Sequence, residues 1–123
     1  MKRVLIVEDD NDLARLYEKV LARSGCETEI VGSVDDAIRN LVKLAPDVVL
    51  LDWVLGHETS EVLLRYLQSF EATRPRVLLV SGRIRKDKLR LYAGVVDQVL
   101  QKPVSMESIA AAVAGTGACC AVG

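Results

Sequence analysis

The chain has 123 residues, of which 50% are hydrophobic and 27% charged, and these values are typical of one globular domain. Its 16 basic and 17 acidic residues leave a net charge of −1, which excludes binding to nucleic acid or an anionic membrane by the surface as a whole. Three cysteines without metal-ligand spacing and one histidine disfavour a zinc site or a disulfide framework. No apolar run reaches the ~18 residues that cross a bilayer, and we expect a reduced, cytoplasmic protein.

The first half of the chain predicts three strands and two helices. Residues 4–7 form a buried strand, and the helix after it has an apolar stripe made of Leu13, Leu16, Tyr17, Val20 and Leu21. Ser24 and Gly25 end this helix, and 28–31 form a short second strand. Ser33 begins the next helix and Pro46 ends it, with a stripe of Val34, Ala37, Ile38, Leu41 and Val42. Residues 48–51 are apolar throughout, which predicts a central third strand.

The second half continues the alternation. The third helix is marked by Leu63, Tyr66, Leu67 and Phe70. A buried strand at 77–80 precedes a basic fourth helix from Ile84 to Ala93, a fifth strand covers 96–100, and a last helix starts near Ser105, with Ile109, Ala112 and Val113 on its face. The pattern predicts an α/β protein: a (βα)₅ doubly wound parallel five-stranded sheet over residues 1–114. A Gly/Ala-rich tail, 115–123, is expected to be flexible.

Polar residues follow four of the predicted strands: Glu8, Asp9 and Asp10, then Asp52, then Ser81 and Gly82, then Lys102 and Pro103. The carboxyl ends of parallel strands meet at one edge, where ligands of such sheets bind. Carboxylates about 4 Å apart repel each other by roughly 4 kcal/mol per pair, so this edge needs positive charge. Mg²⁺ suits oxygen-only ligands, and a carboxylate can accept a phosphoryl group covalently. The edge therefore predicts phosphoryl-transfer chemistry.

Each of these residues also has a structural interpretation. Asp10 is expected to be the N-cap of the first helix rather than a ligand. Glu8 and Asp9 alone fit a solvated turn, and Lys102 alone fits a surface lysine. Asp52 differs, because a carboxylate that ends an apolar central strand needs a partner or a metal ion.

The pattern resembles the receiver domains of two-component response regulators over nearly the whole chain. The residues that carry the resemblance are Val4 to Asp10, Leu50 to Asp52, Val80 to Gly82, and Lys102-Pro103. The resemblance implies a flavodoxin-like sheet with strand order 2-1-3-4-5. It also implies that Asp52 is the phosphoacceptor, with Mg²⁺ as the cofactor.

The other site roles come from the same resemblance. It implies that Asp9 and Asp52 bind the metal, Glu8 binds it through water, and the backbone carbonyl of Val54 is a further ligand. Ser81 and Lys102 would contact the phosphoryl oxygens. The Lys102-Pro103 peptide would be cis, placing Pro103 so that Lys102 enters the site; cis X-Pro bonds are uncommon enough to be informative.

Several positions depart from the family pattern. The loop after Asp52, from Trp53 to Ser60, lacks the usual Pro-Gly pair and later glycine. Its His57 is either a phosphorelay or metal-binding residue or, as we expect, an exposed loop histidine. Val99 replaces the aromatic residue of the usual switch, so Ser81 and Val99 predict a weak or differently wired switch. Val54 and Arg83 flank the expected path of the hydrolytic water, and the apolar Val54 predicts a long-lived phosphoryl group.

Basic residues cluster in the fourth helix: Arg83, Arg85, Lys86, Lys88 and Arg90. They form either a solvated face or a docking surface for an acidic partner or a second copy of the domain. The resemblance places signalling contacts, including a homodimer, on the fourth helix, fifth strand and fifth helix. Without a recognition motif or stacking aromatics, no direct nucleic-acid binding is expected. Cys119 and Cys120 are interpreted as part of the tail rather than a membrane anchor.

Two functions remain open. One is a phosphorylation-dependent switch in which Asp52 takes a phosphoryl group from a histidine kinase or phosphotransfer protein and controls a downstream effector or attached output domain. The other is a pseudo-receiver, a constitutive interaction module with the fold but not the switch. In neither case do we expect an enzyme acting on external substrates. A nucleotide-binding fold is not expected, because Glu8 to Asn11 occupy the turn where such a fold has its glycine-rich loop. The last helix, ending near Ala114, fits both a stand-alone receiver and one excised from a longer protein.

Overall fold

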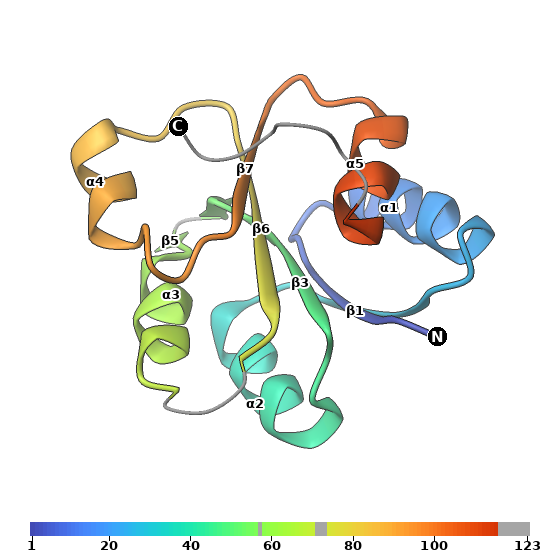
Figure 1. The fold of residues 1–123 in the computed structure, drawn as a ribbon, viewed down its shortest axis with the longest axis horizontal. Coiled ribbons are helices and arrows are strands. Elements are labelled where there is room, and N and C mark those ends of the chain that lie inside the picture. Colours follow the sequence, from blue (N-terminus) through green and yellow to red (C-terminus); the bar gives the residue numbers. More distant parts are fainter. Residues whose placement is uncertain (57, 71–73, 116–123) are drawn as a thin grey trace.

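The computed structural model of the protein describes residues 1–56, 58–70 and 74–115, and its centre is a five-stranded parallel sheet (Figure 1). The strands, in spatial order, are β2 (Glu27–Val31), β1 (Arg3–Val7), β3 (Val48–Asp52), β6 (Arg76–Ser81) and β7 (Gln98–Gln101). Counted along the chain, β6 and β7 are the fourth and fifth strands of this sheet, so the predicted order 2-1-3-4-5 is confirmed. The two remaining strands, β4 (Val54–Leu55) and β5 (Glu58–Thr59), pair with each other antiparallel in the loop after β3.

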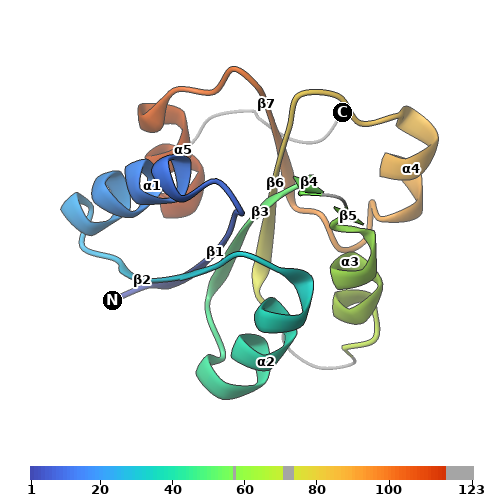
Figure 2. The same ribbon diagram turned by 180° about the vertical axis from the view of Figure 1, so that it is seen from behind.

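Helices cover both faces of the sheet, as Figures 1 and 2 show. The helices α1 (Asn11–Arg23) and α5 (Met106–Ala114) pack on one face, while α2 (Val34–Leu44) and α3 (Glu61–Gln68) pack on the other, with α4 (Lys86–Leu91) beside α3. Side chains of a strand alternate between the faces. Val4 and Ile6 therefore join the α1 and α5 core, whereas Leu5 and Val7 join the α2 and α3 core. The doubly wound α/β fold is confirmed.

Side-chain caps fix where three helices begin. The Asp10 carboxylate accepts hydrogen bonds from the backbone N–H groups of Asp12 and Leu13. Ser33 accepts one from Asp36, and Ser105 accepts one from Ser108. Each cap satisfies an amide that has no partner inside the first turn. Asp10 is thus the N-cap of α1, as predicted, and α1 begins directly beside the acidic edge of the sheet.

The predicted apolar stripes of α1 and α2 are partly wrong. Leu16 is 50% exposed and Val42 is 73% exposed. The rest of the two stripes is confirmed, since Tyr17 and Leu21 of α1 and Val34, Ala37 and Leu41 of α2 are buried. Ala14, which was not in the predicted stripe, is also buried in α1.

Two predicted boundaries in the second half also change. The basic helix α4 is shorter than the predicted 84–93, and Arg85 precedes it as the N-cap. The fifth strand begins at Gln98 rather than Val96, because Val95 and Val96 are buried in the turn before it. Within the described residues, none of the helices has the length and hydropathy of a membrane-spanning segment.

Candidate functional site

The predicted site residues meet in a depression at the carboxyl edge of the sheet. Asp52 and Ser81 are the last residues of β3 and β6, Glu8 directly follows β1, and Lys102 directly follows β7. The same depression is lined by Asp9, Asp10, Trp53, Val54, Gly82 and Arg83. Parallel pairing brings these strand ends together, since β3 lies between β1 and β6, and β7 lies beside β6.

Asp52 is the centre of this site and is paired with Lys102. The Lys102 ammonium donates to Asp52 Oδ2 at 2.7 Å, and the Val54 amide donates to Oδ1 at 3.3 Å. The Asp52 side chain is 5% exposed, so the pair is largely shielded from water on the carboxylate side. Burial lowers the pKa of Lys102, but the hydrogen bond and charge of Asp52 outweigh it and the net pKa is raised. The Lys102-Pro103 peptide is cis, as the resemblance implies.

Glu8 is a buried carboxylate without a matching cation. Its Oε2 accepts a 3.3 Å hydrogen bond from the Asp10 amide, whereas its Oε1 is buried with no hydrogen-bond partner. Burial, followed by the nearby carboxylate of Asp52, raises the pKa of Glu8 to about 8. Asp9, the next residue, is exposed at the mouth of the depression. The acidic edge therefore carries more negative charge than Lys102 alone can balance.

These oxygens fit the mode in which proteins bind Mg²⁺. Among the described residues, no three His, Cys, Asp or Glu side chains form a ready-made cage for a metal ion. Mg²⁺ usually takes only one or two carboxylates together with waters and other oxygens. The unpartnered Glu8 Oε1, the exposed Asp9 carboxylate and Asp52 supply that kind of donor set. Gly56 lies beside the Asp9 carboxylate, since a Cβ added there would lie 3.5 Å from Asp9 Oδ2.

Ser81 and Tyr17 both have buried hydroxyl groups without a hydrogen-bond partner among the described residues. Such groups are few in folded proteins and call for a reason. Ser81 ends β6 and lines the depression, so its free hydroxyl is available to donate to a group bound there. Tyr17 was predicted only as a core residue. Burial and the nearby charges of Glu8 and Asp52 raise the pKa of its phenol.

Val99, the other predicted switch residue, lies in β7. Its side chain is half-buried and packs against the core on the α2 and α3 face. Position 99 carries no aromatic ring, so the ring rotation of the usual receiver switch has no counterpart there.

Ser60 is a site residue that the sequence analysis did not single out. It is fully buried, and its hydroxyl donates a hydrogen bond to the backbone carbonyl of Asp52. Its amide donates to the carbonyl of Trp53 at 2.9 Å. A serine directly before a helix usually signals an N-cap, and this expected role would have concealed the contact with Asp52.

The predicted docking residues are only partly free. Arg85 pairs with Asp87 at 3.1 Å, and Lys88 pairs with Glu61 of α3 at 3.1 Å. Glu61 also accepts a hydrogen bond from the Tyr92 hydroxyl. Within the part of the chain that the structure describes, Arg83, Lys86 and Arg90 are exposed and form no ion pair. His57, Cys119 and Cys120 lie outside the described residues.

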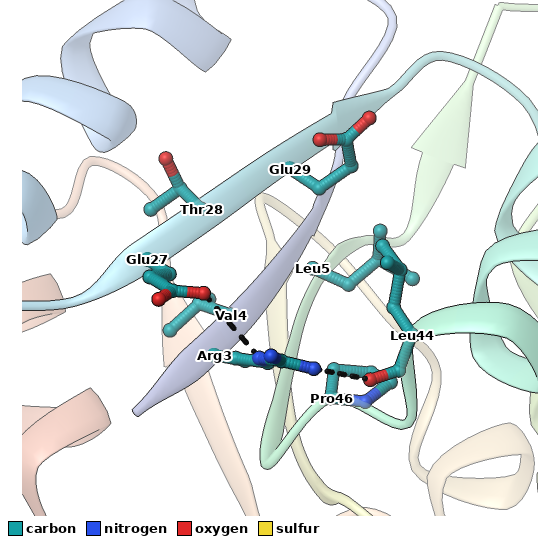
Figure 3. Close-up of a pocket in the computed structure, with 8 residues that line it drawn as sticks. All are labelled: Arg3, Val4, Leu5, Glu27, Thr28, Glu29, Leu44 and Pro46. Carbon is teal, nitrogen blue, oxygen red and sulfur yellow. Dashed lines mark hydrogen bonds and ion pairs between the residues drawn. The ribbon is translucent and has the colours of Figure 1, made fainter. Parts of the chain in front are cut away.

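A second depression lies at the opposite, amino edge of the sheet, between β1, β2 and the end of α2 (Figure 3). Its arginine, Arg3, is engaged by the Glu27 carboxylate at 3.3 Å and by the Leu44 carbonyl at 3.3 Å. Glu29 and Pro46 complete its rim. None of the predicted site residues lines it, which leaves the carboxyl edge as the candidate site.

Comparisons with known proteins agree with this geometry. The response regulator receiver domain family matches residues 4–114. The chain is 28% identical over 112 residues to the phosphate regulon transcriptional regulatory protein PhoB of Escherichia coli, covering 89% of this chain and 49% of that protein. It is 30% identical over 108 residues to the transcription factor SKN7 of Candida albicans, covering 86% of this chain and 19% of SKN7. The chain thus spans half or less of these relatives.

Solved structures show the same fold. The signal receiver domain of a response regulator from Bermanella marisrubri superposes with a TM-score of 0.81 at 29% identity, covering 93% of this chain and 96% of that one. A signal receiver domain from Vibrio parahaemolyticus superposes with a TM-score of 0.83 at 24% identity, covering 94% of this chain and 88% of that one. The family match covers nearly the whole of this chain, and the strand order and acidic edge agree with it. The chain therefore belongs to the receiver domains of response regulators.

Proposed function

We propose that the domain is a phosphorylation-dependent switch whose phosphoacceptor is Asp52. The observation that carries the proposal is the 2.7 Å contact between Lys102 Nζ and Asp52 Oδ2 on a carboxylate that is 5% exposed. A buried carboxylate held by an ammonium at the open edge of a parallel sheet is placed to attack an incoming phosphoryl group. The neighbouring Glu8 and Asp9 supply the further carboxyl oxygens that a divalent cation would need.

In the proposed reaction, an Asp52 oxygen forms a bond to phosphorus while the bond from phosphorus to a histidine nitrogen of the donor breaks. The Lys102 ammonium then pairs with a phosphoryl oxygen, and the free hydroxyl of Ser81 donates to another. Mg²⁺ held by Glu8, Asp9, Asp52 and the Val54 carbonyl would neutralise the charge on the transferring group. The domain would catalyse only its own phosphorylation and the later hydrolysis of the acyl phosphate.

The test is incubation of the chain with acetyl phosphate and Mg²⁺, followed by intact mass measurement. We expect the mass of one added phosphoryl group, and we expect it to disappear in Asp52→Asn. A folded wild-type chain that gains no mass with acetyl phosphate or with a phosphorylated histidine kinase domain would contradict the switch. That result would favour the pseudo-receiver, which the valine at position 99 and the altered loop after Asp52 would explain.

Val54 predicts a slow loss of the phosphoryl group. Its side chain is 55% exposed and lines the depression, where it has no polar atom to orient an attacking water. We expect phosphorylated protein to persist well beyond seconds after the phosphodonor is removed, and Val54→Asn to shorten this lifetime severalfold. The measurement is the decay of the phosphorylated mass with time. A lifetime of seconds that Val54→Asn leaves unchanged would refute this role.

The partners follow from the same proposal. The donor is a histidine kinase or phosphotransfer protein, and the receiver of the signal is a downstream effector or an attached output domain. PhoB and SKN7, which the chain resembles, are named as a transcriptional regulatory protein and a transcription factor. The exposed cations Arg83, Lys86 and Arg90 support docking of an acidic partner at α4, or of a second copy through α4, β7 and α5.

A further inference from the structure

Ser60 occupies a helix-capping position without capping the helix. It directly precedes α3, where a serine hydroxyl normally accepts a hydrogen bond from an amide of the first turn. In this protein the hydroxyl makes no such bond. It donates instead to the carbonyl of Asp52, eight residues earlier, from a fully buried position. The Ser60 hydroxyl therefore contacts the backbone of the candidate phosphoacceptor instead of capping α3.

This contact belongs to a set that fixes the backbone around Asp52. The amide of Ser60 donates to the Trp53 carbonyl at 2.9 Å, and the amide of Trp53 donates to Val80 of β6 at 2.9 Å. One residue further on, Val54 pairs with Thr59 in the small β4 and β5 hairpin. The amide of Val54 also donates to Asp52 Oδ1 at 3.3 Å. Residues 52–54 are thus held from both sides, and Ser60 provides two of the contacts.

We infer that Ser60 is a positioning residue for the metal ion, acting through the backbone of residues 52–54. This inference rests on the proposed function, because it needs a divalent cation bound near Asp52 and the Val54 carbonyl. Ser60 is neither one of the proposed metal ligands nor one of the residues proposed to contact the phosphoryl group. It holds the segment that carries two of the proposed ligands, as outer residues of a metal site hold the inner ones.

The experiment compares the Mn²⁺ affinity of the wild type with that of Ser60→Ala. Mn²⁺ accepts the same oxygen ligands as Mg²⁺. Free Mn²⁺ is counted by its electron paramagnetic resonance signal as the full chain is titrated. Outer residues of metal sites are worth about 10- to 100-fold in affinity, and we expect Ser60→Ala to weaken binding about tenfold. In Ser60→Ala, the rate of phosphorylation by acetyl phosphate should be below the wild-type rate at low Mg²⁺ and should reach the wild-type rate at saturating Mg²⁺.

Two control variants separate positioning from general damage. Ser24→Ala removes a serine hydroxyl that also donates to a backbone carbonyl, that of Val20 at 3.1 Å, but at the C-terminal end of α1. Ile109→Val removes one buried methylene from α5 and loosens the core. Both variants should bind Mn²⁺ as the wild type does, at a temperature where circular dichroism shows every variant folded.

The outcomes are distinct. Mn²⁺ affinity that Ser60→Ala leaves unchanged, in a wild type that binds Mn²⁺ and is phosphorylated, overturns the role of Ser60 and leaves the proposed function standing. A phosphorylation rate that stays low in Ser60→Ala at saturating Mg²⁺ also overturns it. A folded wild type that neither binds Mn²⁺ nor gains a phosphoryl group overturns the proposed function, and the inference about Ser60 with it.

Discussion

Replacing Lys102 by methionine is expected to slow the phosphorylation of Asp52 by acetyl phosphate about a hundredfold. The ammonium lies 2.7 Å from Asp52 Oδ2 and is the cation placed to meet the charge of an incoming phosphoryl group. Removing one such preorganised donor from an active site typically costs about 10²- to 10³-fold in rate. Methionine keeps most of the length of the side chain, so the loss reports mainly the charge and the hydrogen bonds. The initial rate from intact mass measurements checks this.

The same substitution should strengthen the binding of a divalent cation, because it leaves Asp52, Glu8 and Asp9 without the competing ammonium. Lys2→Met is the matched control. Its ammonium also donates a hydrogen bond from a half-buried position, to the Val113 carbonyl at 2.8 Å, but it comes from the N-terminal end of β1. We expect its phosphorylation rate to equal that of the wild type. An unchanged rate in Lys102→Met would remove Lys102 from the reaction.

Asp97 is expected to contribute stability that is lost in acid. The Arg74 guanidinium donates to Asp97 Oδ2 at 2.9 Å, and the Val77 amide donates to the same oxygen at 2.7 Å. These bonds join the turn before β7 to the start of β6. Burial raises the pKa of Asp97, but the hydrogen bonds from Arg74 and the Val77 amide, together with the charges of Arg74 and Arg76, outweigh it, and the net pKa is lowered.

A carboxyl group whose pKa is lower in the folded than in the unfolded protein stabilises the fold above its unfolded pKa. That stability is lost as the pH falls through the folded value. Asp97→Asn should therefore lower the free energy of unfolding by roughly 1–2 kcal/mol at pH 7, a value kept small because the side chain is partly exposed to solvent. The difference from the wild type should begin to shrink as the pH approaches the ordinary aspartate value of 3.8 and should vanish only below the lower folded value. Urea unfolding between pH 7 and pH 2 measures both quantities.

Asp87→Asn is the control for this measurement. Asp87 also pairs with an arginine, Arg85 at 3.1 Å, but its side chain is 61% exposed. Exposed pairs contribute about 0–1 kcal/mol, so this variant should stay close to the wild type at every pH. A loss of stability in Asp97→Asn that stays undiminished as the pH falls to 2 would show that the carboxylate charge is not its source.

The sequence was most informative about the strands and their ends. Runs such as 48–51 and 77–80 are apolar on both faces, which only a buried parallel strand requires, and so the sheet and the residues after each strand followed. Asp10 was predicted as a cap because its side chain must serve the amides beside it. Helix faces were less well predicted. Leu16 and Val42 fit an apolar stripe by spacing alone, but the width of the buried face depends on how closely each helix approaches the sheet.

The loop after Asp52 was beyond the reach of sequence patterns. The β4 and β5 hairpin is only two residues long on each side, so alternation of apolar and polar residues had too little length to show it. The hydroxyl of Ser60 is compatible with several local partners, and its choice of the Asp52 carbonyl is decided by the path of the loop through the core. Local preference favours an amide of α3 as the partner of this hydroxyl, whereas the observed partner is the Asp52 carbonyl.

The joint that Glu61 makes between α3 and α4 has a consequence for recognition. Lys88 is neutralised by Glu61, and Tyr92 donates its hydroxyl hydrogen to the same carboxylate. An acidic ligand that captures Lys88 must first break its ion pair with Glu61, so these two contacts of Lys88 are mutually exclusive. Any such ligand binds more weakly by the free energy of that ion pair, and weakening the pair from within the molecule raises the ligand's affinity by the same amount.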